Sequence, residues 1–179
     1  MAKKVIHIFG SAGAGTSTLG RALSNKLRYF FMDTDAYYWA PVDPPFSVKR
    51  EPAKRVELMQ KDIDGHDNVV ISGALSGWGD VLIPEFTLAV RVETETSIRI
   101  ERLRKRERDQ FGSRIDPGGD MQKIYEDFIE WAARYDEGGL EIRSKARHDE
   151  WQKKLQCPVV LLDGSLPVET NLEILKEYL

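Results

Sequence analysis

A glycine-rich segment near the N-terminus has the residue types and spacing of a phosphate-binding loop. Residues 5–9 are an apolar run that stops at Gly10, and a stretch with helical periodicity begins at Thr16. In loops of this layout, backbone N–H groups and the N-terminus of the following helix surround a phosphate group. Glycines let the backbone approach the phosphate oxygens closely. The candidate phosphate-binding residues are all small: Gly10, Ser11, Ala12, Gly13, Ala14, Gly15, Thr16, Ser17 and Thr18.

The loop departs from the usual motif at one position. In the pattern Gly10-x4-Gly15-x-Ser17, this chain has Thr16 where a lysine normally stands. That lysine reaches the terminal phosphates and neutralises charge in the transition state. The alternative interpretation is a tight strand-to-helix turn whose small residues serve packing alone. We favour the phosphate site, with Ser17 as a hydroxyl ligand of Mg2+ and with arginines from elsewhere in place of the lysine.

Two aspartates follow the second expected strand, where carboxylates can hold Mg2+ or accept a proton from a hydroxyl group. They are Asp33 and Asp35. The alternative is a pair of turn-forming residues after a strand. The third strand ends in Ser72 and Gly73 without an acidic residue, so Mg2+ needs a carboxylate from another strand. We therefore predict Asp33 as a metal ligand and catalytic group, and Asp35 and Gly73 as substrate-binding residues.

Arginines crowd residues 99–108, which have helical periodicity. This periodicity puts Arg104 and Arg108 beside Ile100 and Leu103, at the edge of the core-facing stripe. The opposite, solvated side is expected to carry Arg99, Arg102 and Arg106. The alternative for the whole run is a surface helix with salt bridges. We predict that the inner pair, Arg104 and Arg108, reaches the phosphates.

Three further arginines complete the candidate site. Arg114, which we predict to be catalytic together with Arg104 and Arg108, lies within residues 112–119, a segment flanked by glycines. Such a segment is typical of a lid that closes over ATP and excludes water, although a plain mobile loop has the same composition. Arg50 and Arg55 could bind an acceptor phosphate bidentately, and a solvated helix face is the alternative for at least one of them.

Alternating strands and helices indicate an α/β protein. Apolar runs predict strands at residues 5–9, 28–32, 68–73, 88–92 and 159–162. Helical periodicity predicts helices at residues 16–27, 47–64, 96–108, 121–135, 140–155 and 167–179. Such a chain forms a five-stranded parallel sheet with helices on both faces and binds ligands at the carboxyl ends of the strands. We expect a single domain over residues 1–179, with an acceptor-binding helical region at about 36–67 and a small lid at about 109–120.

Composition argues against several other classes of protein. A net charge of −3 disfavours a protein that lives on nucleic acid. A single cysteine, Cys157, and three scattered histidines provide neither a disulfide framework nor a zinc site. The N-terminal apolar run is too short for a signal peptide or a membrane span. We expect a cytoplasmic protein with small-molecule ligands and without nucleic-acid or membrane partners.

The chain resembles the P-loop nucleoside monophosphate kinase-like family. Residues 13–18, Gly-Ala-Gly-Thr-Ser-Thr, are similar to the lysine-less loop of archaeal-type cytidylate kinases, in which threonine at this position is compatible with kinase activity. Asp33, Asp35 and Trp39 resemble a pattern in adenylate-kinase-like or topology-modulation proteins. Residues 162–165, Leu-Asp-Gly-Ser, resemble the nucleotide-side loop of cytidylate kinases. Shikimate kinases also have an Asp-x-Asp after the second strand.

The resemblance implies an enzyme that transfers a phosphoryl group from ATP, with Mg2+, to a small acceptor. A nucleoside monophosphate is the favoured acceptor. One alternative is a kinase of a small hydroxylated metabolite, shikimate-like or gluconate-like, in which Asp33 or Asp35 acts as the base. The other alternative is a nucleotide-binding regulatory protein without catalysis, which the missing lysine and the missing acid of the third strand both favour.

Overall fold

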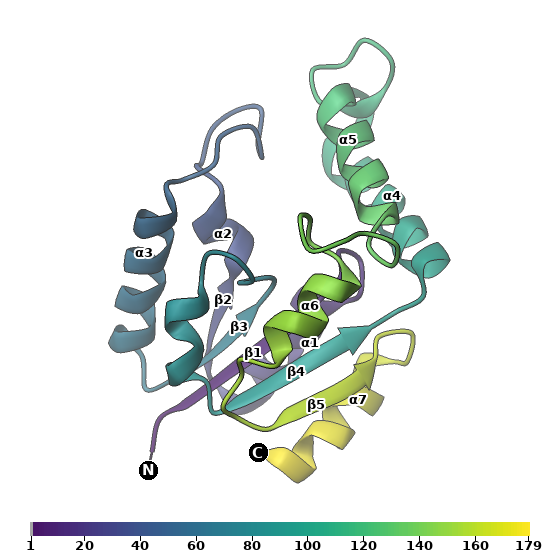
Figure 1. The fold of residues 1–179 in the computed structure, drawn as a ribbon. Coiled ribbons are helices and arrows are strands. Elements are labelled where there is room, and N and C mark those ends of the chain that lie inside the picture. Colours follow the sequence, from purple (N-terminus) through teal and green to yellow (C-terminus); the bar gives the residue numbers. More distant parts are fainter. Residues whose placement is uncertain (1) are drawn as a thin grey trace.

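The computed structural model describes residues 2–179, and across these residues five strands form one parallel sheet (Figure 1). The strands are β1 (Lys4–Gly10), β2 (Phe30–Asp33), β3 (Asn68–Ser72), β4 (Leu88–Glu93) and β5 (Val159–Asp163). Their order across the sheet is β2-β3-β1-β4-β5. Parallel neighbours require crossover connections, which helices provide. The predicted fold class is confirmed.

The helices occupy the connections between the strands and extend beyond the sheet. They are α1 (Thr16–Leu27), α2 (Thr34–Tyr38), α3 (Pro52–Gly65), α4 (Thr96–Phe111), α5 (Gln122–Ala133), α6 (Lys145–Gln152) and α7 (Val168–Leu175). Short 3-10 turns are η1 (Asp80–Glu85), η2 (Gly112–Ile115) and η3 (Lys176–Tyr178). Among the described residues, none of the helices has the length and hydrophobicity required to span a bilayer.

The central strand, β1, is buried on both faces. Ile6 and Ile8 pack with residues of α1 and α7 on one face of the sheet. Val5 and Phe9 pack with residues of α3 and α6 on the other face. This arrangement follows because successive side chains of a strand point to opposite faces. A strand covered on both sides must be apolar throughout, which explains why β1 was recognisable as a continuous apolar run.

Two helices begin later in the chain than the sequence suggested. Helix α3 starts at Pro52, not at residue 47, because proline fits the first turn of a helix and has no N–H group to leave unpaired. Helix α6 starts at Lys145, not at residue 140. Ser144 caps this helix by accepting a hydrogen bond of 3.0 Å from the backbone N–H of Arg147.

Helix α4 buries a different face from the one that its sequence suggested. The buried residues stand four apart: Arg99, Leu103, Glu107 and Phe111. Arg104 and Arg108 are exposed, so the prediction that they face inward while Arg99 faces solvent is wrong. The apolar anchors Leu103 and Phe111 set the inward face, and Arg99 joins them because its guanidinium bonds to backbone carbonyl oxygens.

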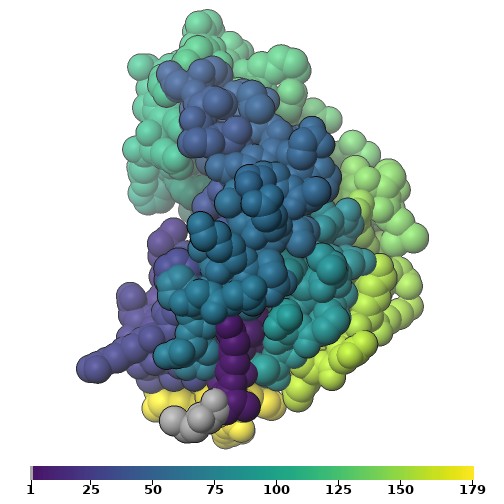
Figure 2. All heavy atoms as spheres, turned by 90° about the vertical axis from the view of Figure 1, so that its left-hand side faces the viewer, coloured from purple at the N-terminus to yellow at the C-terminus, as the bar shows by residue number. Residues whose placement is uncertain are grey.

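The helices α4 and α5 rise together from the carboxyl end of the sheet, with η2 at their far end (Figure 1). A small apolar cluster there includes Phe111, and Phe46 reaches it from the loop between α2 and α3. Arg114 of η2 makes an ion pair of 2.8 Å with Asp43 of the same loop and one of 2.6 Å with Asp120. Figure 2 shows this loop, in blue, against the green atoms of the predicted lid. We call these contacts between Asp43, Phe46 and the lid the lid clasp.

Two histidines are buried without charge. His7 of β1 is 0% exposed, and its Nε2 donates a hydrogen bond of 2.9 Å to the Gly73 carbonyl oxygen. Burial lowers the pKa of His7 to about 4. His148 of α6 is hydrogen-bonded through Nδ1 to the Tyr135 hydroxyl at 2.8 Å, and burial lowers the pKa of His148 to about 3. Both rings are therefore neutral in the folded protein at pH 7.

We expect the free energy of unfolding to fall as the pH is lowered from 7 to 4. An unfolded histidine has a pKa of about 6.5 and takes up a proton in this range, whereas the buried rings do not, so protonation favours the unfolded state. The loss amounts to about 3 kcal/mol for His7 at pH 4, at roughly 1.4 kcal/mol per pKa unit. Urea unfolding at several pH values measures this loss in the free energy of unfolding. His7→Gln removes part of the decline, and an unchanged pH dependence in this variant would contradict the assignment.

The lid clasp predicts a local effect on stability. Asp43→Asn removes the ion pair with Arg114, and exposed pairs of this kind contribute about 1 kcal/mol at most. We therefore expect amide hydrogen exchange at residues 111–121 to accelerate by about two- to fivefold. The matched control is Asp127→Asn, which breaks the exposed pair with Lys123 on α5 and should leave the exchange of these amides unchanged. Equal exchange in the Asp43 variant and the wild type would show that the ion pair does not hold the lid.

Candidate active site

The loop between β1 and α1 depends on glycine at several positions. Gly13 and Gly15 have φ angles of 80° and 101°, in the left-handed region. A Cβ atom on Gly10 would lie 2.3 Å from the Val92 carbonyl oxygen. Gly15 is the N-cap of α1, so the N–H groups of the first helical turn lack partners within the helix. These N–H groups and the positive end of the helix dipole make the loop an anion-binding site.

The carbonyl groups of the loop are held from outside. Arg99 Nη1 donates a hydrogen bond of 3.1 Å to the Ala12 carbonyl oxygen. Thr94 Oγ1 donates one of 3.1 Å to the Ala14 carbonyl oxygen. A peptide group whose carbonyl oxygen points outward directs its N–H group inward. These contacts therefore help to orient the donors that a phosphate group requires.

Ser17 and Asp33 lie together at the start of α1. Ser17 Oγ donates a hydrogen bond of 3.1 Å to Asp33 Oδ2, and Ser72 Oγ lies 3.5 Å from Ser17 Oγ. Arg21 Nη2 is 3.8 Å from the same Asp33 oxygen. Hydroxyl and carboxylate oxygens are the protein ligands that Mg2+ takes beside nucleotide phosphates. The structure thus brings together the two residues that the sequence indicated as metal ligands.

Asp35 occupies the first turn of α2, next to this pair. Its backbone N–H donates a hydrogen bond of 3.2 Å to Asp33 Oδ1, which caps the helix. Desolvation by the surrounding protein raises the pKa of the Asp35 carboxyl, and the positive charges of Arg143 and Arg106 oppose this rise. The negative charge of Asp33 adds to the rise in the pKa of Asp35. Because the Asp35 residue is exposed, solvent screening makes the rise smaller. A carboxylate with a raised pKa beside a metal site suits the acceptance of a proton.

Arg143, between α5 and α6, is a candidate that the sequence analysis missed. Its guanidinium lies 4.4 Å from the centre of the Trp131 ring. The buried Nε atom has no hydrogen-bond partner among residues 2–179. Burial lowers the pKa of Arg143, and the nearby Asp35 carboxylate opposes this shift. No motif or periodicity marks this arginine, because only the tertiary fold brings it to Asp35.

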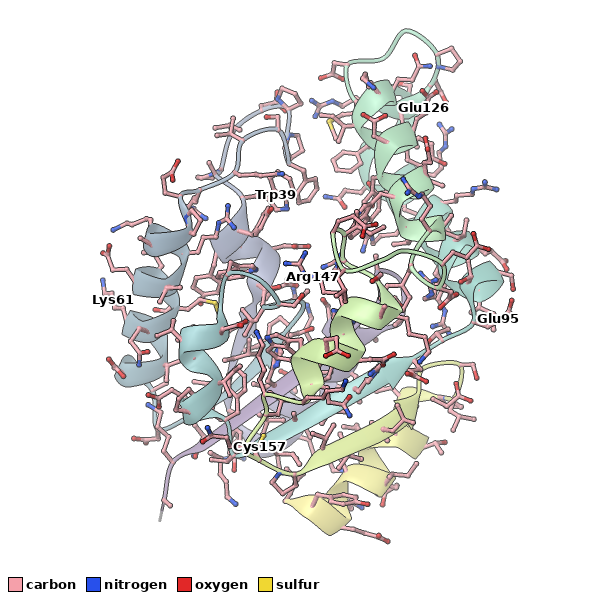
Figure 3. The ribbon with its side chains drawn as sticks, in the orientation of Figure 1. Trp39, Lys61, Glu95, Glu126, Arg147 and Cys157 are labelled. Atoms are coloured by element: carbon pink, nitrogen blue, oxygen red, sulfur yellow. The ribbon has the colours of Figure 1, made fainter. Side chains whose placement is uncertain are left out.

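Arg147 belongs to α6 and is labelled in Figure 3 above the carboxyl end of the sheet, as is Trp39. Its Nη1 donates a hydrogen bond of 3.2 Å to the Leu140 carbonyl oxygen. A Cβ atom on Gly77 would lie 1.9 Å from Arg147 Nη2. Arg147 therefore covers the loop after β3, and a side chain at position 77 would displace it.

The two arginines expected on the acceptor side differ in their surroundings. Arg50 Nη1 donates hydrogen bonds to the backbone carbonyl oxygens of residues 36, 37 and 39, so this guanidinium closes the end of α2. Arg55 is buried, and its guanidinium lies 3.8 Å from the Tyr38 ring centre and 5.6 Å from that of Trp78. Arg55 is thus part of an aromatic group close to Asp35, while Arg50 has a structural role.

Gly73, which we predicted to bind substrate, ends β3 in a left-handed conformation with φ of 116°. A Cβ atom there would lie 1.9 Å from Thr34 Oγ1. Its N–H group donates to the Ile8 carbonyl oxygen, and its carbonyl oxygen accepts from His7. Because both backbone groups are occupied, Gly73 allows the ends of β2 and β3 to approach each other.

The arginines predicted to replace the lysine point elsewhere. Arg108 Nη1 makes an ion pair of 2.7 Å with Asp116, and Arg114 belongs to the lid clasp. Arg104 is exposed on α4. A catalytic role for these three residues stays a prediction. Arg102 of α4 lies beside the loop: its Nη1 would lie 3.9 Å from a Cβ atom on Gly15 and donates a hydrogen bond of 2.9 Å to the Gly164 carbonyl oxygen.

A hollow of about 470 Å³ adjoins the loop at Ser11, between the ends of β4 and β5 and the base of the lid. Its lining includes Glu93, Glu95, Asp136 and Asp163. Lys145 also lines the hollow, but the four carboxylates outweigh its charge and disfavour a phosphate group there. The inner side of the loop, toward Ser17 and Asp33, is therefore the better candidate for a phosphate site.

Comparisons with known proteins identify relatives of this chain and structures with a similar fold. The uncharacterized protein YqaC of Bacillus subtilis (strain 168) is 41% identical over 177 residues, which cover 99% of this chain and 98% of that protein. A cytidylate kinase of Mycoplasmopsis agalactiae is 32% identical over 80 residues, 41% of this chain and 36% of that enzyme. The crystal structure of shikimate kinase from Bacteroides thetaiotaomicron matches with a TM-score of 0.59 and 18% identity, covering 98% and 97% of the two chains.

A family profile described as "AAA domain" matches residues 6–116, which include the loop, both aspartates and α4. This match covers more than half of the chain, and the full-length similarity to YqaC is consistent with it. The chain therefore belongs to the AAA domain family of P-loop proteins and has a P-loop kinase-like fold.

Proposed function

We propose that this protein transfers the γ-phosphoryl group of ATP to a hydroxyl group of a small, negatively charged acceptor. The observation that carries the proposal is the grouping of Asp35 with the Ser17–Asp33 pair and with Arg143. Phosphoryl transfer requires bound phosphates, a metal ion and an acceptor positioned in line with them. The loop, the Ser17–Asp33 pair and the region around Asp35 are suited to these three tasks.

On the nucleotide side, the N–H groups of residues 11–17 hold the β- and γ-phosphates of ATP. Ser17 and Asp33 hold Mg2+, since their oxygens form the donor set described above. Bound Mg2+ neutralises charge on the phosphate oxygens. Arg102 stands at the outer edge of the loop beside Gly15 and provides a positive charge for the nucleotide.

On the acceptor side, Asp35 distinguishes between two kinds of nucleophile. A neutral hydroxyl group must lose a proton during transfer, and a carboxylate of raised pKa accepts it. The phosphate group of a nucleoside monophosphate is already ionised at neutral pH and would be repelled by the same carboxylate. Arg143 Nε, which has no partner within the described part of the chain, favours an acceptor that also carries a carboxylate or phosphate group.

A nucleoside monophosphate, the acceptor that the sequence favoured, is the second candidate. The rings of Tyr38 and Trp78, with Arg55 between them, support it because a planar base stacks on such surfaces. The partial similarity to a cytidylate kinase supports it as well. The fold shared with a shikimate kinase accords with a hydroxyl acceptor. A role in binding nucleotide without turnover is the third possibility, supported by Thr16 in the lysine position.

Coupled measurement of ADP release separates these candidates. The panel contains hydroxy acids, sugar acids, nucleosides and nucleoside monophosphates, each with ATP and Mg2+. We expect acceptor-dependent release with hydroxylated anions. Turnover with nucleoside monophosphates alone would favour the second candidate. Tight ATP binding without acceptor-dependent release from any compound would exclude both kinase functions.

Asp35→Asn tests the base directly. We expect the turnover number to fall at least 100-fold, because general base catalysis contributes about 10²- to 10⁴-fold, while the KM for ATP stays within twofold. In the wild type, activity should decline as the pH falls through the raised pKa of Asp35, since the base must be deprotonated. Asp64→Asn, an exposed carboxylate on α3, is the matched control. A variant of Asp35 with normal turnover and an unshifted pH profile would contradict its role.

Arg143→Gln tests the binding of the acceptor. We expect the KM for the acceptor to rise about 10- to 100-fold, because a hydrogen bond to a charged group contributes roughly 1.5–3 kcal/mol, and the KM for ATP to stay unchanged. Arg143→Lys should recover part of the loss, since it keeps the charge. Arg134→Gln, at an exposed position after α5, is the control. A normal KM for the acceptor in the Arg143→Gln variant would contradict the assignment.

A further inference from the structure

Arg99 stands out among the buried residues because it is a charged side chain with 0% exposure. Its Nη1 donates to the Ala12 carbonyl oxygen at 3.1 Å and to the Ala132 carbonyl oxygen at 3.2 Å. Its Nε donates to the Thr94 carbonyl oxygen at 3.0 Å, and its Nη2 donates to Thr96 Oγ1 at 2.6 Å. One buried cation is thus bonded to the phosphate loop, to the start of α4 and to α5.

The charge of this guanidinium is only partly balanced. Asp136 lies 3.6 Å from Nη2, and half of its side chain is exposed to solvent. The other partners are neutral oxygens. Burial lowers the pKa of Arg99, but a guanidinium stays protonated in proteins. A charge in a region of low dielectric acts over a longer range than a surface charge, so Arg99 contributes a positive potential behind the loop that offsets the carboxylates lining the adjacent hollow.

Helix α4 also contacts the loop directly. A Cβ atom on Gly13 would lie 2.7 Å from the Arg99 carbonyl oxygen and 3.0 Å from Leu103 Cγ. The first turns of α4 and the phosphate loop therefore pack without space between them. Any change in the position of Arg99 moves both the Ala12 carbonyl group and the charge next to it.

We propose that Arg99 is a positioning residue that compensates for the absent loop lysine at position 16. It holds the Ala12 carbonyl oxygen outward, so that the loop N–H groups face the phosphates, and its charge attracts the phosphates through the loop. The proposal rests on the proposed function, because it presupposes that the loop binds ATP. Arg99 does this without contact to the nucleotide, unlike the lysine of the usual motif.

Titration calorimetry with ATP and Mg2+ tests the proposal in a double-mutant cycle. We expect Arg99→Gln to weaken ATP binding at least tenfold in the natural loop. In a Thr16→Lys background, where a lysine occupies the usual position, we expect Arg99→Gln to weaken ATP binding less than threefold. Lys105→Gln, which removes an exposed charge from the same helix, is the control and should change ATP affinity less than twofold. Thermal unfolding of each variant establishes that it is folded.

The outcomes separate this proposal from the proposed function. An equal loss of affinity in both backgrounds would show that Arg99 has a structural role alone and would overturn the compensation. Unchanged ATP binding by Arg99→Gln would overturn it as well. Failure of the wild type to bind ATP would instead overturn the proposed function, and the compensation with it.

A second variant keeps the test valid if Arg99→Gln does not fold. Asp136→Asn retains the arginine and removes its ion-pair partner, so the positive potential behind the loop rises. We then expect ATP to bind about two- to threefold more tightly in the natural loop. Unchanged or weaker ATP binding by a folded Asp136→Asn variant would contradict the electrostatic part of the proposal.

Discussion

The direction of the peptide groups in residues 11–15 is the constraint on which the candidate site depends. A loop binds phosphate only if its N–H groups point inward, and its carbonyl oxygens then require partners outside. Here Arg99 and Thr94 supply those partners from the β4–α4 connection. The sheet order matters for the same reason, because β4 lies next to β1 and brings this connection behind the loop. Helix α4, the phosphate loop and the sheet thus form a single packed unit.

Local features of the sequence were sufficient for the fold and the phosphate loop. Helix α1 spans the predicted residues 16–27 because a glycine cap and an apolar stripe define it locally. The inner strands β1, β3 and β4 were recognisable because buried parallel strands are continuous apolar runs, whereas the edge strand β2 begins at Phe30 and not at residue 28. Ser17 and Asp33 could be paired from sequence, since both follow strands that meet at one edge of the sheet. Each of these inferences depends on neighbours in the chain or on a general rule of α/β topology.

The side-chain surroundings of the arginines could not be predicted in the same way. An amphipathic pattern assigns charged residues to solvent, but Arg99 is buried because carbonyl groups from the loop and from α5 surround it. Those partners lie 87 and 33 residues away in the chain. Arg143 influences the pKa of Asp35 for a comparable reason, since the segment between α5 and α6 brings its charge near that carboxylate in the fold and not in the sequence. For Arg114 the sequence suggested a catalytic group in a lid over ATP, and the structure shows its guanidinium paired with Asp43.

The central claim is that a loop without the usual lysine binds the phosphates of ATP beside a metal held by Ser17 and Asp33. A crystal structure of the chain with ADP and Mg2+ measures this directly. We predict the β-phosphate within hydrogen-bond distance of the N–H groups of residues 13–17 and Mg2+ about 2.1 Å from Ser17 Oγ. Phosphates bound to the lid arginines instead, with an empty loop, would contradict the account.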